Sequence, residues 1–369
     1  MAEPMISLRN VSKRYDSASA GAAVDDLSLD IADGETVVLV GPSGCGKTTT
    51  MKMINRLIEP TSGSITVNGT DVLRQDPVQL RRNIGYVIQS IGLMPHRTVA
   101  ENIAMVPHLL EWDDARIAKR IDELADIFDL DRELLPRYPA ELSGGQRQRV
   151  GVARALAADP PVMLMDEPFA AVDPIVRARL QDQFLDIQER LRKTIVFVTH
   201  DIDEAIKMAD RIAILNRGAK VEQYATPEEI LRTPAGEFVA GFVGAERGLK
   251  RLALIPISSI EVEPGPVVAP SATAEEARRV IRDGAPGWAS VVDDGELLGW
   301  IDESDLGSAA TVADTKAHRF SAWVTATDSL RTALDSIVTS ETNVAVVVTE
   351  GQRYRGILTL ERLTQEIAQ

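Results

Sequence analysis

Short apolar runs recur along the first 200 residues of the chain, and each ends at a glycine, a carboxylate or a histidine. The runs cover residues 36–40, 162–166 and 195–199, and valine, isoleucine, leucine and methionine dominate them. Continuous apolar runs of about five residues, bounded by polar residues, are typical of buried strands. A helical stretch at 48–58 follows the first run. The pattern predicts an α/β fold.

The segment between the first strand and the helix carries a specific motif. It reads Gly41-Pro-Ser-Gly-Cys-Gly-Lys-Thr48, which matches G-x-x-x-x-G-K-[ST] in the strand–loop–helix setting that this pattern requires. Glycines let backbone N–H groups turn inward around phosphates, at a helix N-terminus that favours anions. Lys47 adds a point charge, and Thr48 offers a hydroxyl to Mg²⁺. The motif predicts binding of a nucleoside triphosphate by these residues: Gly41, Ser43, Gly44, Cys45, Gly46, Lys47, Thr48 and Thr49.

Five further motifs are present in the chain. They are Gln89 in Tyr86-Val-Ile-Gln89, Leu142-Ser-Gly-Gly-Gln146, the run ending at Asp166 with Glu167 after it, Ala171-Val172-Asp173, and His200 with Asp201 after the third run. Singly, each could be ordinary structure, because a histidine after a strand is more often a surface residue than a switch. Together they resemble the ATP-binding-cassette (ABC) superfamily over residues 5–245.

The resemblance implies a catalytic role for each motif. Asp166, Thr48 and Gln89 would hold Mg²⁺, and Glu167 would orient or deprotonate the attacking water. His200 would contact the γ-phosphate, and Gln89 would report the nucleotide state. Tyr15 matches the place where the family stacks an aromatic ring on adenine, although a tyrosine that merely covers the first sheet is the alternative.

The signature residues imply a second copy of the chain. In the superfamily this motif closes over the ATP bound by another cassette, again at a helix N-terminus. One chain carries one phosphate loop and one signature. The resemblance therefore implies a homodimer in which these residues face the partner's nucleotide: Ser143, Gly144, Gly145, Gln146 and Asp173.

Composition narrows the class of protein further. The 369 residues suggest two or three domains. No apolar run approaches the roughly twenty residues that span a bilayer, and the first residues lack the features of a signal peptide. A single cysteine excludes an internal disulfide framework. The net charge of −15 argues against nucleic acid as a partner.

The last third of the chain repeats itself. A helical stretch at 273–281, an apolar strand at 288–292, a turn and a second strand at 298–301 recur at 329–337, 344–348 and 355–358. The spacing matches, since Gly299 corresponds to Gly356. Each unit is too small to bury much core, so we expect the two to pack face to face.

This repeat resembles a pair of CBS domains, at 256–308 and 309–369, after a linker at 246–255. CBS pairs commonly bind adenosyl ligands through a Thr/Ser-x-x-Asp motif. The first repeat keeps Asp305, whereas the second has Arg362 at the matching position. The resemblance implies a regulatory adenine nucleotide, such as cyclic di-AMP, at Asp305. A degenerate pair that serves as a dimerisation spacer is the alternative.

The combination of cassette and CBS pair resembles the ATP-binding subunit of importers for glycine betaine, carnitine, choline or proline betaine. The expected fold is a P-loop cassette with a RecA-like core, an antiparallel β subdomain and a helical subdomain at about 90–145, followed by an α+β CBS pair. The apolar residues Ile91, Leu93, Met94 and Pro95 lie where that family receives its permease.

This resemblance also implies the partners and the place of action. The chain would act at the cytoplasmic face of the membrane on two permease subunits, and indirectly with a substrate-binding protein. Two alternatives remain: an importer for another solute, such as an amino acid or a sulfonate, and a soluble ABC ATPase outside transport.

Overall fold

The computed structural model describes residues 3–15, 21–89, 92–170, 172–284, 286–349 and 351–368. The chain divides into two compact units, Met1–Val243 and Gly244–Gln369. Among the described residues, no helix is long and apolar enough to cross a membrane.

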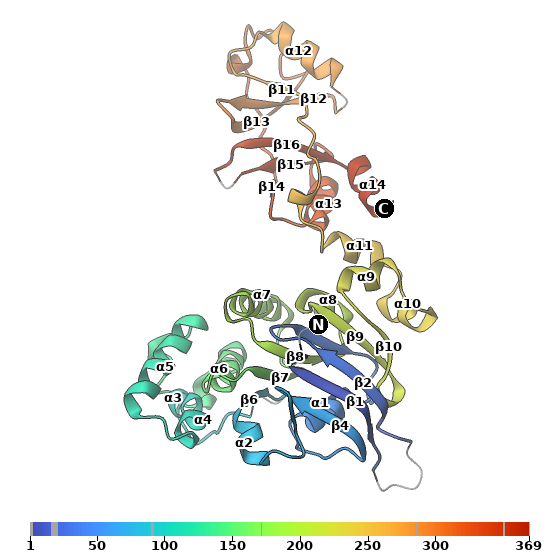
Figure 1. The fold of residues 1–369 in the computed structure, drawn as a ribbon. Coiled ribbons are helices and arrows are strands. Elements are labelled where there is room, and N and C mark those ends of the chain that lie inside the picture. The colour runs from blue at the N-terminus through green and yellow to red at the C-terminus, as the bar shows by residue number, and fades with distance from the viewer. Residues whose placement is uncertain are drawn as a thin grey trace. The chain divides into compact units, whose positions relative to one another are not determined.

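A six-stranded sheet forms the centre of the first unit (Figure 1). Five neighbouring strands are parallel, and only the edge strand β10 runs antiparallel. All five residues of β3 are buried, as expected for a parallel strand covered on both faces. In spatial order the strands are β10 (Lys220–Ala225), β9 (Arg211–Asn216), β3 (Thr36–Val40), β8 (Thr194–Thr199), β7 (Val162–Asp166) and β6 (Ile84–Val87).

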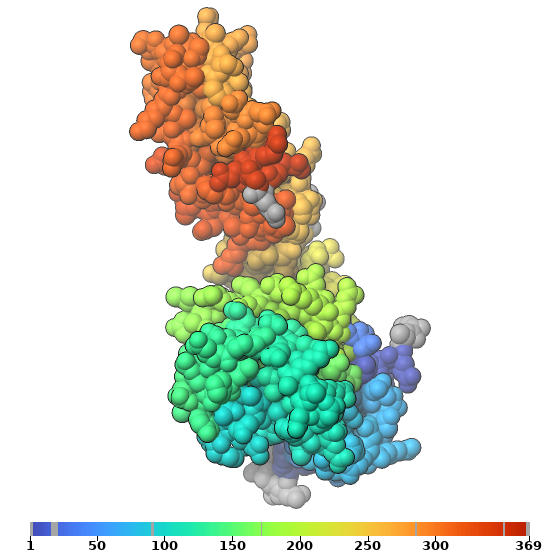
Figure 2. Space-filling model, turned by 90° about the vertical axis from the view of Figure 1, so that its left-hand side faces the viewer, coloured from blue at the N-terminus to red at the C-terminus, as the bar shows by residue number. Residues whose placement is uncertain are grey.

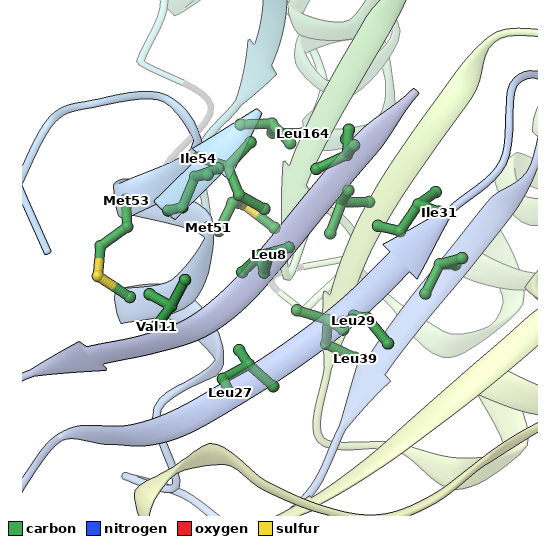
Figure 3. Close-up of a cluster of buried hydrophobic side chains, with 14 of the residues drawn as sticks. Leu8, Val11, Leu27, Leu29, Ile31, Leu39, Met51, Met53, Ile54 and Leu164 are labelled. Carbon is green, nitrogen blue, oxygen red and sulfur yellow. The ribbon is translucent and has the colours of Figure 1, made fainter. Parts of the chain in front are cut away.

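A second, antiparallel sheet covers one side of the same unit. Its strands, in spatial order, are β2 (Val24–Ile31), β1 (Ile6–Lys13), β4 (Ser62–Val67) and β5 (Thr70–Asp71). Figure 3 shows Leu8 of β1 and Ile31 of β2 in one cluster with Met51 of the helix that follows the phosphate loop. These three side chains are fully buried, so the hydrophobic effect joins the antiparallel sheet to the core beneath the loop.

Helices complete the first unit. In Figure 2 the segment from α3 to α6 forms the teal and green face that is turned toward the viewer. This segment corresponds to the helical subdomain, so the three expected parts of a cassette are present. The helices are α1 (Lys47–Ile54), α2 (Pro77–Arg82), α3 (Val99–Ile103), α4 (Met105–Leu109), α5 (Asp114–Ile127), α6 (Gly144–Leu156), α7 (Pro174–Leu191), α8 (Ile202–Met208), α9 (Pro227–Arg232) and α10 (Glu237–Val243).

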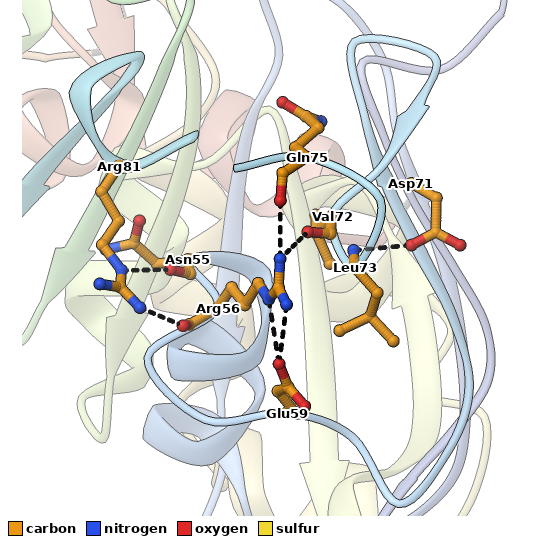
Figure 4. A network of polar contacts seen from close by, with 8 residues as sticks. All are labelled: Asn55, Arg56, Glu59, Asp71, Val72, Leu73, Gln75 and Arg81. Carbon is orange, nitrogen blue, oxygen red and sulfur yellow. Dashed lines mark hydrogen bonds and ion pairs between the residues drawn. The ribbon is translucent and has the colours of Figure 1, made fainter. Parts of the chain in front are cut away.

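The helix predicted at 48–58 ends earlier than expected, at Ile54. Arg56 adopts a left-handed backbone conformation with φ +45°, which terminates the helix. Its guanidinium donates to the carbonyl oxygen of Gln75 at 2.7 Å and pairs with Glu59 at 2.9 Å (Figure 4). Arg81 donates to the Arg56 carbonyl at 2.6 Å. The predicted extension was wrong because these tertiary contacts favour a turn.

The second unit contains two similar three-stranded sheets. In each, a short first strand pairs in parallel with the second, which pairs antiparallel with the third. The first sheet consists of β11 (Val267–Val268), β12 (Trp288–Asp293) and β13 (Glu296–Asp302), and the second of β14 (Val324–Thr325), β15 (Val344–Val348) and β16 (Tyr354–Thr359). The helices of this unit are α11 (Arg247–Leu252), α12 (Ala274–Asp283), α13 (Leu330–Thr339) and α14 (Leu360–Ala368).

Each repeat packs its first residues in the core of the other repeat. Ile257, at the start of the first repeat, donates its N–H to the Asp328 carbonyl at 2.8 Å and packs in the core of the second repeat. Val312, near the start of the second repeat, donates to the Ala272 carbonyl at 3.0 Å and packs in the core of the first. Trp288 joins Val346 of the other sheet in a shared cluster. The repeats therefore pack against each other, as predicted from their size.

Candidate functional site

The phosphate loop runs from the end of β3 into the start of α1, and glycine is required at two of its positions. A side-chain carbon on Gly41 would lie 2.1 Å from the carbonyl oxygen of Leu215, so only glycine fits. Gly46 has φ +114°, and a side-chain carbon there would lie 2.5 Å from the carbonyl oxygen of Ala23. Tight packing beneath the loop therefore fixes its backbone path.

The other loop residues divide into buried and accessible groups. The Lys47 side chain is 6% exposed, and its ammonium donates to the carbonyl oxygens of Gly41 at 2.7 Å and Pro42 at 3.1 Å. Cys45 is buried with its free thiol, whereas Ser43 and Gly44 are exposed and Thr49 is partly buried. A third contact joins the ammonium to the Cys45 sulfur at 3.8 Å, so these three contacts all lie within the loop.

Thr48 and Asp166 meet at the carboxyl edge of the parallel strands. The Thr48 hydroxyl donates to Oδ1 of Asp166 at 3.0 Å. Asp166 is 9% exposed, and burial raises the pKa of its carboxyl group, while the Thr48 hydrogen bond opposes that shift. Among the described residues no cluster of three or more His, Cys, Asp or Glu side chains could hold a metal ion. One hydroxyl and one carboxylate nevertheless fit Mg²⁺, which usually takes only one or two protein carboxylates beside substrate phosphates.

Glu167 lies one residue beyond β7 and contacts residues from two other strand ends. Gln89 donates from Nε2 to Oε2 of Glu167 at 2.9 Å, and Nδ1 of His200 lies 3.2 Å from Oε1. Glu167 has φ +46°, so its backbone leaves the strand direction at this point. The structure therefore brings the three predicted catalytic side chains together. A carboxylate at such an edge, 22% exposed, can accept a proton from water.

The signature residues and Asp173 lie at the starts of two other helices. Ser143 accepts a hydrogen bond at its hydroxyl from the Gln146 N–H at 3.2 Å, and Gln146 accepts one from the Ser143 N–H at 2.8 Å. Gly144 and Gly145 form the first turn of α6. Asp173 accepts from the N–H of Ile175 and so caps α7. No hydrogen bond within the described ranges joins these residues to the phosphate loop of their own chain.

Tyr15 stands apart from this constellation, and two other predicted positions are not described. Tyr15 follows β1 and is 50% exposed, with the Lys13 ammonium 5.4 Å from its ring centroid. Ile91 and Ala171, in the predicted permease segment and the Asp173 motif, lie outside the described residues. Within the described ranges, no hydrogen bond or ion pair joins Tyr15 to the phosphate loop.

A buried asparagine organises the loop that follows Gln89. Asn102 is fully buried, accepts from the Met94 N–H at 2.7 Å and donates to the carbonyl oxygens of Arg97 at 3.0 Å and Met94 at 3.2 Å. Met94 is 39% exposed. Sequence reasoning missed the role of Asn102, although an amide directly before the apolar residues 103–107 is a usable signal.

A second buried network was also missed. Gln181 of α7 donates to Glu204 of α8 at 2.9 Å, and burial raises the pKa of the Glu204 carboxyl group. Arg177, one turn before Gln181, donates to the carbonyl oxygen of Val172, next to Asp173. The network links the helix that follows His200 to the segment that carries Asp173.

In the second unit, Asp305 already has partners within the chain. Its Oδ2 accepts from the Asp302 N–H at 2.9 Å, and its Oδ1 lies 2.9 Å from Nε2 of His318. The His318 ring stacks on Trp300 with centroids 4.5 Å apart. At the matching position of the second repeat, Arg362 pairs with Glu366 at 2.9 Å.

The comparisons with known families agree with this division of the chain. The "ABC transporter" family model matches residues 24–170, and the "CBS domain" model matches residues 257–310 and 319–369. A dimeric structure of the ATP-binding cassette MJ0796 bound to ADP and Pi matches with TM-score 0.54 and 34% identity, over 60% of this chain and 99% of that chain. The fold and the site thus define an ABC ATPase cassette followed by a tandem CBS pair, which confirms the predicted fold class.

Full-length relatives specify the family further. The osmoprotectant import ATP-binding protein OsmV of Salmonella typhimurium is 48% identical over 357 residues, 95% of this chain and 93% of the relative. The choline transport ATP-binding protein OpuBA of Bacillus subtilis is 47% identical over 367 residues, 96% of this chain and 94% of the relative. The chain belongs to this family of CBS-containing ATP-binding subunits of ABC transporters, as the sequence motifs indicated, and it binds ATP.

Proposed function

We propose that the chain hydrolyses ATP to energise the import of a quaternary-amine osmoprotectant: glycine betaine, carnitine, choline or proline betaine. The convergence of Gln89 and His200 on Glu167, next to the Thr48–Asp166 pair, carries the catalytic part of this proposal. The solute class rests on relatives that are named for osmoprotectant, choline, and glycine betaine/carnitine/choline transport.

The loop and the strand ends would share the chemistry as follows. Backbone N–H groups of residues 41–49 and the Lys47 ammonium bind the β- and γ-phosphates of ATP. Thr48 and Asp166, with Gln89 nearby, would hold Mg²⁺. When bound, the ion would neutralise the negative charge of the phosphates. Glu167 orients the attacking water and accepts its proton, and His200 stabilises the charge that develops on the γ-phosphate. Tyr15 stacks on the adenine ring.

A second copy would complete each site. Ser143 and Gln146 use their N–H groups in the capping bonds of α6, so Gly144 and Gly145 would present the N–H donors, and Asp173 lies at the start of α7. These residues are separate from the phosphate loop of their own chain, which supports their action on the ATP of a partner. Two chains would bind two ATP molecules, close, and drive a pair of permease subunits from the cytoplasmic face of the membrane. A substrate-binding protein would deliver the solute to the permease.

The CBS pair, from the linker at 246–255 onward, would regulate this cycle. Asp305 is its candidate contact for an adenine nucleotide such as cyclic di-AMP, and the ligand would have to displace His318 from the carboxylate. The alternative is a spacer that only holds two copies together.

Uptake assays test the solute class in cells whose chromosomal copy of this gene is deleted, compared with and without the gene on a plasmid. We expect gene-dependent uptake of labelled glycine betaine or choline, and none of an amino acid or taurine. Gene-dependent uptake of taurine or an amino acid alone would favour the second candidate, an importer for another small solute, which shares every catalytic motif.

A further inference from the structure

A cavity of about 370 Å³ lies in the second unit, away from the residues discussed so far. The segment before β14 contributes Arg319, Phe320 and Trp323 to its wall, and the remaining lining residues are Leu297, Leu298, Gly299, Val348 and Gln352. We refer to it as the hairpin cavity, because residues of both antiparallel hairpins line it: Leu297, Leu298 and Gly299 of the first, and Val348 and Gln352 of the second. Its volume lies within the range of small-molecule sites in proteins.

The pseudo-symmetry of the unit explains why this cavity is open. In the first repeat Val292 pairs with Leu297, and in the second repeat Val348 pairs with Tyr354, in each case directly after an irregularity in the ladder. Leu297 and Tyr354 are therefore equivalent positions. The Tyr354 hydroxyl donates to the carbonyl oxygen of Pro264 at 2.8 Å and lies beside Gly265, where a side-chain carbon would be 2.8 Å from it.

The segment that Tyr354 contacts has its own counterpart at the cavity. Glu263 forms a bridge with Ile357, and His318 forms the equivalent bridge with Trp300. The residues after Glu263 thus correspond to the residues after His318, which include Arg319 and Phe320. In the second repeat the Tyr354 side chain reaches this segment through its hydroxyl, whereas in the first repeat the shorter Leu297 occupies the equivalent position and lines the cavity.

The chemistry of the wall identifies what would fill this space. Trp323 is 50% exposed at the cavity, and Phe320 is partly buried beside it, so a planar ring can pack on aromatic faces. Arg319 is the only charged lining residue, and among the described residues it has no hydrogen-bond or ion-pair partner. An exposed guanidinium without a partner next to an apolar cavity favours an anionic group on the ligand.

We propose that the hairpin cavity binds a planar aromatic anion, with its ring in the space that Tyr354 fills in the other repeat and its carboxylate, sulfonate or phosphate on Arg319. The site is distinct from Asp305 and does not depend on the proposed transport function, since every lining residue belongs to the second unit.

Calorimetric titration of the full-length protein with 2-naphthoate, without added nucleotide, tests this assignment. Leu297→Tyr should weaken binding at least about tenfold, because it introduces the residue that occupies the equivalent position. Arg319→Gln should weaken the binding of 2-naphthoate by a similar factor but leave the affinity for uncharged 2-naphthol unchanged. Val338→Tyr, at a position that is 72% exposed outside the cavity, is the matched control and should bind like the original protein.

Three results would overturn the proposal: no binding of 2-naphthoate, binding that Leu297→Tyr leaves intact, or equal effects of Arg319→Gln on both compounds. Thermal unfolding of each variant checks that the second unit remains folded. Arg319→Gln is a surface change, so it keeps the test informative if the tyrosine variant is unstable.

Discussion

Gln89 and Glu167 are 78 residues apart in sequence, yet Nε2 of Gln89 donates to Oε2 of Glu167 at 2.9 Å. The bond joins the end of β6 to the end of β7, which are parallel neighbours in the sheet. His200, just beyond β8, contacts the other carboxylate oxygen. Both side-chain oxygens of Glu167 therefore have partners, and these contacts orient the carboxylate at the C-terminal ends of the strands. Open α/β sheets bind ligands at this edge.

Replacing Glu167 by Gln should stop hydrolysis and preserve ATP binding. The amide has nearly the same size but cannot take a proton from water, and general-base catalysis contributes about 10²–10⁴-fold to rate. We expect ATPase activity to fall by about that factor, while ATP stabilises a dimer that size-exclusion chromatography detects. Normal turnover by this variant would refute the assignment of Glu167.

His200→Ala should lower ATPase activity by about 10²-fold with little change in ATP affinity, because a donor that acts on developing charge stabilises the transition state more than the ground state. His108→Ala is the matched control, since His108 is an exposed histidine of the same unit on α4. Steady-state kinetics separates the two effects. Equal losses of ATPase activity in both variants would contradict the proposed role of His200.

Glu204 should make the stability of the first unit depend on pH. Burial raises the pKa of its carboxyl group above the ordinary value of 4.5, so the native state binds this proton more tightly than the unfolded state. Below pH 4.5 the carboxyl group is protonated in both states, so it does not lower the free energy of unfolding. As the pH rises through the native pKa, the native state loses stability relative to the unfolded state, in which the group ionises more easily. Glu204→Gln should therefore gain stability relative to the original protein as the pH rises. Urea denaturation at several pH values measures this difference, and a constant difference would contradict the prediction.

Leu39→Ala should destabilise the first unit by about 2–5 kcal/mol, because Leu39 is 1% exposed in the core beneath the phosphate loop and its truncation leaves a cavity. Val78→Ala, on a side chain that is 49% exposed, should change stability by less than about 0.5 kcal/mol. Chemical denaturation compares the two. Equal effects would mean that the core does not limit stability.

Asp305 offers a direct test of the regulatory ligand. If cyclic di-AMP binds there, Asp305→Ala should weaken its binding to the full-length chain at least about tenfold, because a charged hydrogen-bond acceptor is lost. The exposed Asp335→Ala on α13 is the control. Calorimetry measures the affinity of each variant for cyclic di-AMP. An unchanged affinity in Asp305→Ala would favour the alternative, in which the CBS pair is only a spacer.

The grouping of these proposed catalytic side chains was predictable because each lies at or just beyond a strand end. Parallel strands deliver their carboxyl ends to one edge, so the apolar runs before Asp166 and His200 placed these side chains near Thr48. The hydrogen bond between Gln89 and Glu167 was not predictable in detail, since it depends on the left-handed backbone at Glu167.

Other features depend on contacts that no local pattern records. Ile257 and Val312 lie near the starts of different repeats, and each packs with the other repeat, although nothing in their neighbouring residues indicates the exchange. The end of α1 at Ile54 follows from the bonds of Arg56 to the loop at Gln75. His318 on Asp305 is likewise a tertiary contact across 13 residues.

The most direct test of the central claim is ATP-driven uptake in proteoliposomes that contain this chain and its permease, with the substrate-binding protein added outside. The account predicts that labelled glycine betaine or choline accumulates only with ATP on the side of this chain, and that Glu167→Gln abolishes the accumulation. Uptake that persists without ATP, or at an undiminished rate with Glu167→Gln, would contradict it.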